Sequence, residues 1–233
     1  MEDLRYVLVT GSTSGIGLGV TRRLLTSGYG VIGFGRRSPP DCLKANRNYH
    51  QIQIDLSDPL ALGGIDGVLK NYEGKFCGLI YCAGSAILKR VAECSDIELI
   101  RQINVNLTGA MLCARRVLQY GHPTEIRIIF LGSRSRRFAF DMGAAYCASK
   151  AGLFSLNDCI ALEAKMVHRN VKTSIIELGT VATGFAGKPV NSEQIPTDSV
   201  VKYITEHFEK GMCSDFESRI IEIVPSSERF FHD

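Results

Sequence analysis

The sequence predicts a doubly wound α/β fold, in which a parallel sheet of about seven strands carries helices on both faces. Strand-like runs alternate along the whole chain with segments that have helical periodicity. Two of these runs, Ile126 to Leu131 and Val171 to Leu178, are rich in branched apolar residues, as expected for strands that are covered on both faces. A glycine-rich turn also joins the first strand to the first helix, which is typical of this class of fold.

The expected elements follow in order. Strands are expected at about 5–10, 30–35, 49–54, 77–82, 125–132, 171–178 and 219–224, and neither of the two runs above looks like an edge strand. The first helix is expected from Ile16 to Leu25, and Asp96 is expected to cap a long helix that ends at Tyr120. The stretch at 184–197 has no clear period, and we expect it to form a mobile lid near the strand ends.

Length and composition favour one globular domain that spans residues 1–233. The chain has 45% hydrophobic and 22% charged residues, and its net charge of +3 is too small to predict a nucleic-acid or lipid surface. The sequence has no signal peptide and no run of about eighteen apolar residues, so a cytoplasmic protein without membrane spans is expected. The eight cysteines form no Cys-x-x-Cys pair and no metal-ligand pattern, which predicts reduced, mostly buried thiols and no metal site.

The segment from Thr10 to Gly17, Thr-Gly-Ser-Thr-Ser-Gly-Ile-Gly, has the features of a phosphate-binding turn. It follows an apolar strand and opens a helix whose first amide groups have no partner within the helix, so that the amides and the helix dipole can bind a pyrophosphate. Gly11 permits the turn, Gly15 lets a cofactor approach the backbone, and Gly17 lets the helix pack closely on the sheet. The turn thus predicts a Rossmann-type dinucleotide-binding domain.

A second pattern supports redox chemistry. Tyr146 and Lys150 are four residues apart, so a helix would project both from one face, and Ser133 precedes Tyr146 by thirteen residues. Such a Tyr and Lys pair is usually only a solvated stripe, and a serine after a strand usually serves only the turn. The order of the three residues and the glycine turn together resemble the short-chain dehydrogenase/reductase family, and the resemblance extends from Val7 to about Val224.

The resemblance implies a catalytic group of Asn106, Ser133, Tyr146 and Lys150. Tyr146 would exchange a proton with the substrate oxygen, and we expect the Lys150 ammonium, aided by the oxidised nicotinamide ring, to lower the pKa of the phenol from about 10 to about 7 or 8. Ser133 would hold the substrate oxygen, and Asn106 would order a water between Lys150 and bulk solvent. Asn104 is the competing assignment for the asparagine, and a purely structural asparagine is the further alternative.

The cofactor is expected to be NADP, with NAD as the alternative. The second strand ends in Gly-Phe-Gly-Arg-Arg, where an acid would bond the ribose hydroxyls of NAD and where Arg36 and Arg37 can accept the extra phosphate of NADP. The turn and the Gly-Phe-Gly end also resemble NAD-using hydroxybutyrate dehydrogenases, whereas the arginines are similar to the NADP-dependent 3-hydroxy acid dehydrogenase branch. The resemblance implies that the cofactor-binding residues are Gly11, Ser12, Ser14, Gly15, Ile16, Gly17, Arg36, Arg37, Asp55, Leu56, Ala83, Gly84, Tyr146, Lys150, Gly179 and Thr183.

Two positions depart from the family pattern. Tyr81-Cys82-Ala83-Gly84 replaces the usual Asn-Asn-Ala-Gly and removes an amide that braces the sheet, and Leu178-Gly179 replaces the usual Pro-Gly. Because the four predicted catalytic residues are present, the resemblance implies an alcohol dehydrogenase or carbonyl reductase. The altered segment at 81–84 supports the alternative, a cofactor-binding regulatory or scaffold protein.

The substrate is expected to be a small alcohol or carbonyl compound. Arg134, Arg136 and Arg137 follow Ser133, and either they are merely solvated or they bind an anionic group of that substrate. By resemblance, the protein is expected to be a homodimer or homotetramer.

Overall fold

The computed structural model describes residues 4–167, 169–187, 190–210 and 219–223. The seven strands form one parallel sheet in the order β3-β2-β1-β4-β5-β6-β7. The strands are β1 (Tyr6–Thr10), β2 (Gly30–Gly35), β3 (Tyr49–Gln53), β4 (Phe76–Tyr81), β5 (Ile126–Leu131), β6 (Val171–Leu178) and β7 (Arg219–Ile223). The predicted doubly wound sheet is confirmed, and β5 and β6 are interior strands as expected.

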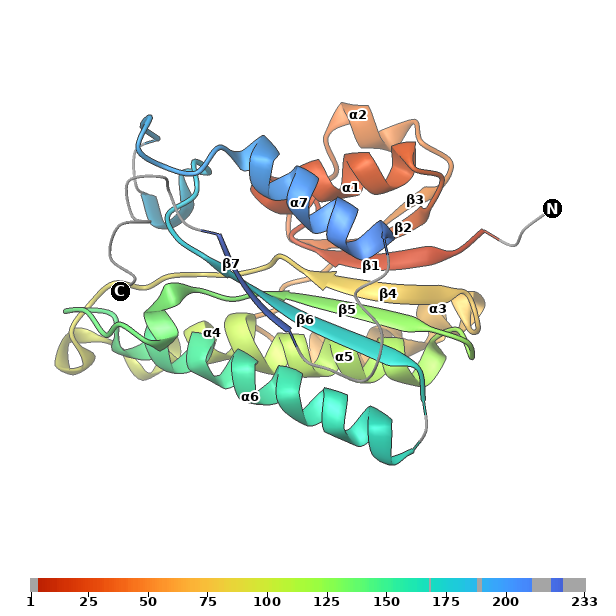
Figure 1. Ribbon diagram of the computed structural model, residues 1–233. Coiled ribbons are helices and arrows are strands. Elements are labelled where there is room, and N and C mark those ends of the chain that lie inside the picture. Colours follow the sequence, from red (N-terminus) through yellow and green to blue (C-terminus); the bar gives the residue numbers. More distant parts are fainter. Residues whose placement is uncertain (1–3, 168, 188–189, 211–218, 224–233) are drawn as a thin grey trace.

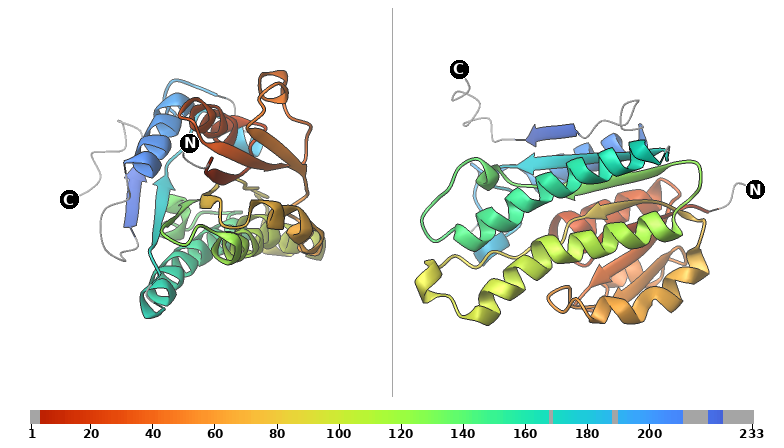
Figure 2. Two further views of the ribbon diagram at one scale, coloured as in Figure 1. Left: turned by 90° about the vertical axis from the view of Figure 1, so that its right-hand side faces the viewer. Right: turned by 90° about the horizontal axis from the view of Figure 1, so that it is seen from below.

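Helices cover both faces of the sheet (Figures 1 and 2). One face carries α1 (Gly15–Thr26) and α7 (Thr197–Glu209), and the other carries α5 (Gly109–Tyr120) and α6 (Ala144–Met166). The remaining α-helices are α2 (Asp41–Lys44), α3 (Asp66–Leu69) and α4 (Asp96–Ile103).

The alternating strand residues build a separate core on each face. In β1, Val7 and Val9 pack with the α1 and α7 side, whereas Leu8 packs with the α5 and α6 side. All three are fully buried. Because successive strand residues point to opposite faces, a strand covered on both sides must be apolar at every position, which is the pattern seen in the sequence.

The long helix expected to end at Tyr120 has a different cap and an interruption. Ser95, not Asp96, is the N-cap: its hydroxyl accepts from the Glu98 amide at 3.3 Å, and the Glu98 carboxylate accepts from the Ser95 amide at 2.9 Å. This reciprocal capping box satisfies two amide groups at once, whereas Asp96 lies within the first turn. A π-helical turn, Asn104–Thr108, then separates α4 from α5.

The segment at 184–197 begins with a short 3-10 turn, Phe185–Gly187, and Ile195 forms a bridge with Val181. Positions 188 and 189 of this segment, like position 224 of the last predicted strand and Cys213, lie outside the described residues. The mobility of the segment stays a prediction.

The seven cysteines of the described part are free thiols, but only two of them, Cys77 and Cys113, are buried. The expectation of mostly buried thiols is therefore wrong, because Cys42 and Cys159 lie on exposed helix surfaces. Among the described helices, none is both long enough and apolar enough to cross a membrane.

Candidate active site

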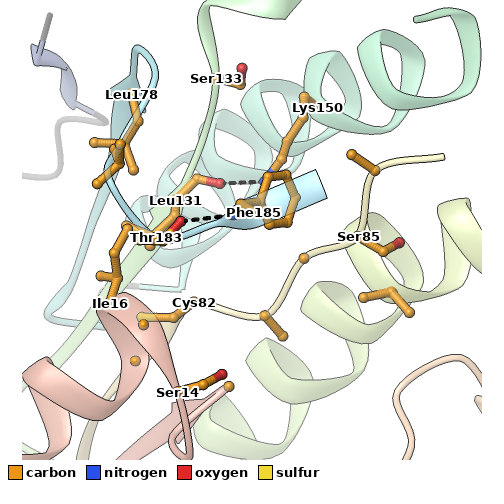
Figure 3. Close-up of a pocket in the computed structure, with 18 of the residues that line it drawn as sticks. Ser14, Ile16, Cys82, Ser85, Leu131, Ser133, Lys150, Leu178, Thr183 and Phe185 are labelled. Carbon is orange, nitrogen blue, oxygen red and sulfur yellow. Dashed lines mark hydrogen bonds between the residues drawn. The ribbon is translucent and has the colours of Figure 1, made fainter. Parts of the chain in front are cut away.

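A cavity of about 960 Å³ lies at the carboxyl ends of the central strands. The segments that follow β1, β2, β4, β5 and β6 all contribute to its wall, as expected for ligand binding in a doubly wound sheet. Figure 3 shows Ser14 and Ile16 of the glycine turn on one side, with Thr183 next to Ile16 and with Lys150 and Phe185 farther from the turn. The glycine turn and three of the four predicted catalytic residues, Ser133, Tyr146 and Lys150, therefore share one cavity.

The glycine turn has the geometry that a dinucleotide requires. Gly11 and Gly15 adopt φ of +67° and +52°, a conformation that strains residues with a side chain. A Cβ atom at Gly17 would lie 2.3 Å from the Gly11 carbonyl oxygen, so only glycine lets the helix start this close to the turn. The Thr10 hydroxyl accepts from the Ala83 amide at 3.0 Å, which fixes the turn against the end of β4.

Ser12 is the one member of the predicted cofactor set that does not line the cavity. It is fully buried, its amide donates to the Phe34 carbonyl at 3.3 Å, and its hydroxyl bonds the Tyr49 hydroxyl at 3.1 Å. Both groups are thus engaged inside the protein, and we correct the expectation of a cofactor contact from Ser12. Its neighbour Thr13, which the sequence analysis missed, lines the cavity.

The edge of the cavity beside β2 is basic. Arg36 and Arg37 are exposed and line the cavity directly after Gly35. Asp55 lies at the same edge: burial opposes its ionisation, but hydrogen bonds from Ser57 and the charges of Arg36 and Arg101 hold the pKa of the carboxyl below its ordinary value. The Ser57 amide donates to Asp55 at 2.9 Å.

Two further contributors complete this edge. Leu56 lines the cavity next to Asp55, as predicted, and Arg101 of α4 adds a cation that the sequence analysis missed. No signal in the sequence links Arg101 to this edge, because the contact joins residues far apart in the chain.

Lys150, Tyr146 and Ser133 meet at the end of β5. Lys150 is buried, and its Nζ donates to the Leu131 carbonyl at 2.8 Å (Figure 3). The same Nζ lies 5.9 Å from the centroid of the Tyr146 ring, which confirms that both side chains occupy one side of α6. Ser133 follows Leu131 by two residues, and its hydroxyl accepts from the Ser135 amide at 3.3 Å.

The acidification expected with a bound nicotinamide stays a prediction, and in the protein without a cofactor the pKa of the phenol shifts the other way. Burial raises the pKa of Tyr146 above 10, and a hydrogen bond with the Ser133 side chain opposes the rise. Burial also lowers the pKa of Lys150 to about 8. Desolvation therefore sets the direction of both shifts, since burial disfavours the charged form of each group.

Asn106, the fourth residue of the predicted catalytic group, is fully buried and does not line the cavity. Its amide nitrogen donates to the Ser85 carbonyl and to the Ser149 hydroxyl, both at 2.9 Å, and its oxygen accepts from the Ser85 amide at 2.8 Å. Asn104 instead donates to the Ser57 carbonyl at 3.0 Å, away from α6. Of the two asparagines, Asn106 is the one that contacts the helix of Tyr146 and Lys150.

The remaining predicted cofactor residues also line the cavity. Gly179, Ala83 and Gly84 lie there, and the Thr183 side chain would be 3.7 Å from a Cβ atom at Gly15. Phe185, which the sequence analysis did not single out, packs against Tyr146 with ring centroids 6.3 Å apart.

The residues at the two departures from the family pattern form hydrogen bonds or strand pairs with their neighbours. Leu178 extends β6 by pairing with Ile223, and the Gly179 amide donates to the Ile223 carbonyl at 2.9 Å. The Tyr81 hydroxyl donates to the Val105 carbonyl at 2.6 Å. Cys82 lines the cavity, and burial raises the pKa of its thiol to about 12, so the thiol stays protonated at neutral pH.

The arginines after Ser133 divide into two kinds. Arg136 and Arg137 both form salt bridges with Glu177, which is fully buried, and the Arg136 Nε lies 3.0 Å from its carboxylate. Arg136 also lies over the Phe154 ring. Neither solvation nor an anionic substrate accounts for these two residues, because a buried carboxylate requires paired cations. Arg134, in contrast, lines the cavity and lies over the Phe138 ring at 5.3 Å.

Within the described part of the chain, no group of three or more His, Cys, Asp or Glu residues could hold a metal ion. The cations and amides of the cavity instead fit an anionic dinucleotide. Its pyrophosphate would lie at the start of α1, and its reactive ring would lie toward Tyr146 and Lys150.

A comparison with protein-family models finds one match, to the short chain dehydrogenases, over residues 5–194. The chain belongs to the short-chain dehydrogenase/reductase family. This assignment makes it a member of an oxidoreductase family whose enzymes bind nicotinamide cofactors.

Individual proteins agree with the family match. A short chain dehydrogenase of Penicillium brasilianum, ausX, is 32% identical over 197 residues, which cover 83% of this chain and 75% of the relative. The 3-oxoacyl-[acyl-carrier-protein] reductase MabA of Mycobacterium bovis is 29% identical over 180 residues, or 77% of this chain and 70% of that protein. A solved short chain dehydrogenase from Burkholderia cenocepacia, in complex with NADP, shares the fold with a TM-score of 0.81 at 20% identity, over 94% of this chain and 96% of the other.

The close approach of Gly17 to Gly11 can be tested directly in this member of the short-chain dehydrogenase/reductase family. We expect Gly17→Ala to lower the free energy of unfolding by about 1–3 kcal/mol, because the new methyl group must displace the backbone at Gly11. Urea denaturation measures the change. Gly63→Ala is the matched control, since a Cβ atom there meets nothing within 4 Å. Equal stability of the Gly17 variant and the unchanged protein would contradict the close packing.

Proposed function

We propose that this chain is an NADP-dependent oxidoreductase that interconverts a secondary alcohol and its ketone, with a 3-hydroxy acid and its 3-keto acid as the favoured pair. The observation that carries the proposal is the convergence of Tyr146, Lys150 and Ser133 on the cavity that also contains the glycine turn. A protein that only binds the cofactor would need the glycine turn alone. A phenol that can transfer a proton, placed in the same cavity, is needed only for a reaction.

The chain supplies the proton and orients the substrate. A bound nicotinamide supplies or accepts the hydride. Because burial raises the pKa of Tyr146 above 10, the phenol carries its proton at neutral pH and can donate it to a carbonyl oxygen during ketone reduction. Ser133 lies beside the phenol and can donate a hydrogen bond to the same oxygen. Lys150, with a pKa of about 8, is mostly charged at pH 7 and stabilises the phenolate that remains after the transfer.

Replacing Tyr146 with Phe tests the proton donor. We expect the change to reduce turnover by at least about a thousandfold while the Kd for NADPH changes less than about threefold, because the ring remains and only the acid is lost. The assay follows NADPH absorbance with acetoacetate, ethyl acetoacetate, cyclohexanone and 9,10-phenanthrenequinone. Retained turnover in the variant would refute the assignment. A protein that binds NADPH but reduces none of these probes would favour the regulatory or scaffold alternative.

The cofactor preference is tested at Arg36 and Arg37, which line the cavity where no acidic side chain follows β2. Each charge-assisted contact to a phosphate contributes about 1.5–3 kcal/mol, so Arg36→Ala with Arg37→Ala should weaken NADPH binding by at least about a hundredfold. NADH binding should change by less than about threefold, since NADH lacks the extra phosphate. Calorimetric titration with both cofactors measures the two effects. Equal losses for NADPH and NADH would exclude recognition of that phosphate.

An anionic substrate group is proposed to bind Arg134, because this arginine lines the cavity that contains Ser133 and Tyr146. Acetoacetate carries the negative charge that the guanidinium would recognise, whereas its ethyl ester is neutral. We expect Arg134→Gln to raise the KM for acetoacetate by at least about tenfold and to leave that for ethyl acetoacetate nearly unchanged. A parallel rise for both probes would indicate that Arg134 shapes the cavity without recognising charge.

A homodimer or homotetramer is proposed through the helices next to the site. Exposed apolar side chains lie on these helices, namely Ile97 and Ile100 of α4, Met111 of α5, and Leu162 and Met166 of α6. Burying them against a second copy would remove this apolar surface from water. Light scattering after size exclusion should give a mass of two or four chains of 25.6 kDa, and a monomer at micromolar concentration would contradict the proposal.

A further inference from the structure

Tyr81, the residue that replaces an asparagine of the family pattern, contacts the π-helical turn beside the proposed catalytic site. It ends β4, is 1% exposed, and donates from its hydroxyl to the Val105 carbonyl at 2.6 Å. Val105 belongs to the π-helical turn and also lines the cavity. The inference below rests on the proposed function, because it concerns how the residues of that site are held.

The Tyr81 hydroxyl gives a carbonyl group of the π-helical turn a hydrogen-bond donor. The extra residue shifts the hydrogen bonds from the usual i−4 pattern, and such turns often occur at functional sites. A carbonyl group that is buried without a donor is destabilising, so the Tyr81 hydroxyl stabilises this turn against relaxation to a regular α-helix. Gly109, directly after the turn, makes the contact possible, since a Cβ atom there would lie 2.5 Å from the Tyr81 hydroxyl oxygen.

The π-helical turn also sets the position of Asn106, the residue after Val105. Asn106 joins two other elements: it bonds both backbone groups of Ser85 after β4, and it donates to the Ser149 hydroxyl of α6 at 2.9 Å. Ser149 donates onward to the Tyr146 carbonyl at 2.8 Å. If the turn became regular α-helix, Asn106 would rotate by about 100° around the helix axis and lose these partners.

We propose that Tyr81 is a positioning residue: through the Val105 carbonyl it holds the π-helical turn, and through Asn106 and Ser149 that turn holds the segment of α6 that carries Tyr146 and Lys150. Gly109 is the complementary residue that leaves room for the phenol.

Hydrogen exchange of the protein without cofactor tests the proposal independently of activity. In Tyr81→Phe we expect exchange to accelerate by at least about tenfold in peptides that cover 104–109 and 144–150, and to change little elsewhere. Tyr120→Phe is the matched control, because it removes the hydroxyl of another buried tyrosine, at the far end of α5. Unchanged exchange in both peptides would overturn the proposal, and so would an equal acceleration over the whole chain.

Two double variants test the order of the contacts. In an Asn106→Ala background, adding Tyr81→Phe should leave exchange at 144–150 unchanged, because the link through Asn106 is already absent. Gly109→Ala alone should reproduce the Tyr81→Phe pattern, since the methyl group displaces the phenol. Adding Gly109→Ala to Tyr81→Phe should change exchange by less than about twofold, because the hydroxyl that the methyl group meets is gone. Additive effects in either pair would contradict the proposed chain of contacts.

The activity readout separates positioning from simple support of the fold. With NADPH and 9,10-phenanthrenequinone, Tyr81→Phe should lower kcat by about tenfold while the Kd for NADPH changes less than about twofold. An unchanged kcat with accelerated exchange would assign Tyr81 to fold stability alone and overturn the positioning role. If the unchanged protein reduces no probe, the proposed function fails, whereas the exchange pattern still decides whether Tyr81 holds α6.

Discussion

The hydrogen bond from the buried Lys150 ammonium to the Leu131 carbonyl is the interaction on which the site depends. It joins α6 to the carboxyl end of β5 at 2.8 Å. Tyr146 lies one helical turn before Lys150, and Ser133 lies two residues after Leu131, so this one contact brings all three side chains to the same end of the sheet. Burying the ammonium has a cost, which appears as the lowered pKa of the lysine, and the bond to the carbonyl compensates part of it.

The surrounding contacts keep that arrangement from relaxing. The buried Glu177 carboxylate, near the end of β6, forms salt bridges with Arg136 and Arg137. These contacts fix the loop that begins at Ser133 to the sheet. On the opposite side, the Thr10 hydroxyl fixes the segment after β4 against the glycine turn. The cavity is therefore bounded by strand ends that are tied to one another, which is the condition for holding a cofactor and a substrate in a fixed relation.

The sequence was sufficient for the fold and for most residues around the cavity, because both follow from local patterns. Branched apolar runs identify buried strands, and the glycine positions identify a turn whose backbone only glycine adopts. What the sequence did not reveal depends on distant neighbours. The buried Glu177 pairs with arginines about forty residues earlier, and the Ser12 hydroxyl bonds the Tyr49 hydroxyl inside the protein. Burial also raises the pKa of Tyr146 in the protein without a cofactor.

The helical segment from Ser95 to Tyr120 likewise combines features that the sequence predicts with contacts that it does not. An acidic residue before an apolar run correctly marked the helix start, but the capping box at Ser95 moved the cap by one residue. The family pattern pointed to Asn106 over Asn104, and the contacts with Ser85 and Ser149 give that choice a physical reason. No pattern in the sequence indicated that Tyr81 would reach the carbonyl of Val105, because that contact exists only where β4 passes the π-helical turn.

The most direct test of the central claim is the pH dependence of kcat for ketone reduction between about pH 6 and pH 10. A charged Lys150 next to a protonated Tyr146 predicts a plateau at low pH and a decline of about tenfold per pH unit above a midpoint near the lysine pKa of about 8. The phenol, with its pKa raised above 10, keeps its proton across most of this range, so the decline reports the lysine. A kcat that stays constant to pH 10, or that rises with pH, would contradict the account.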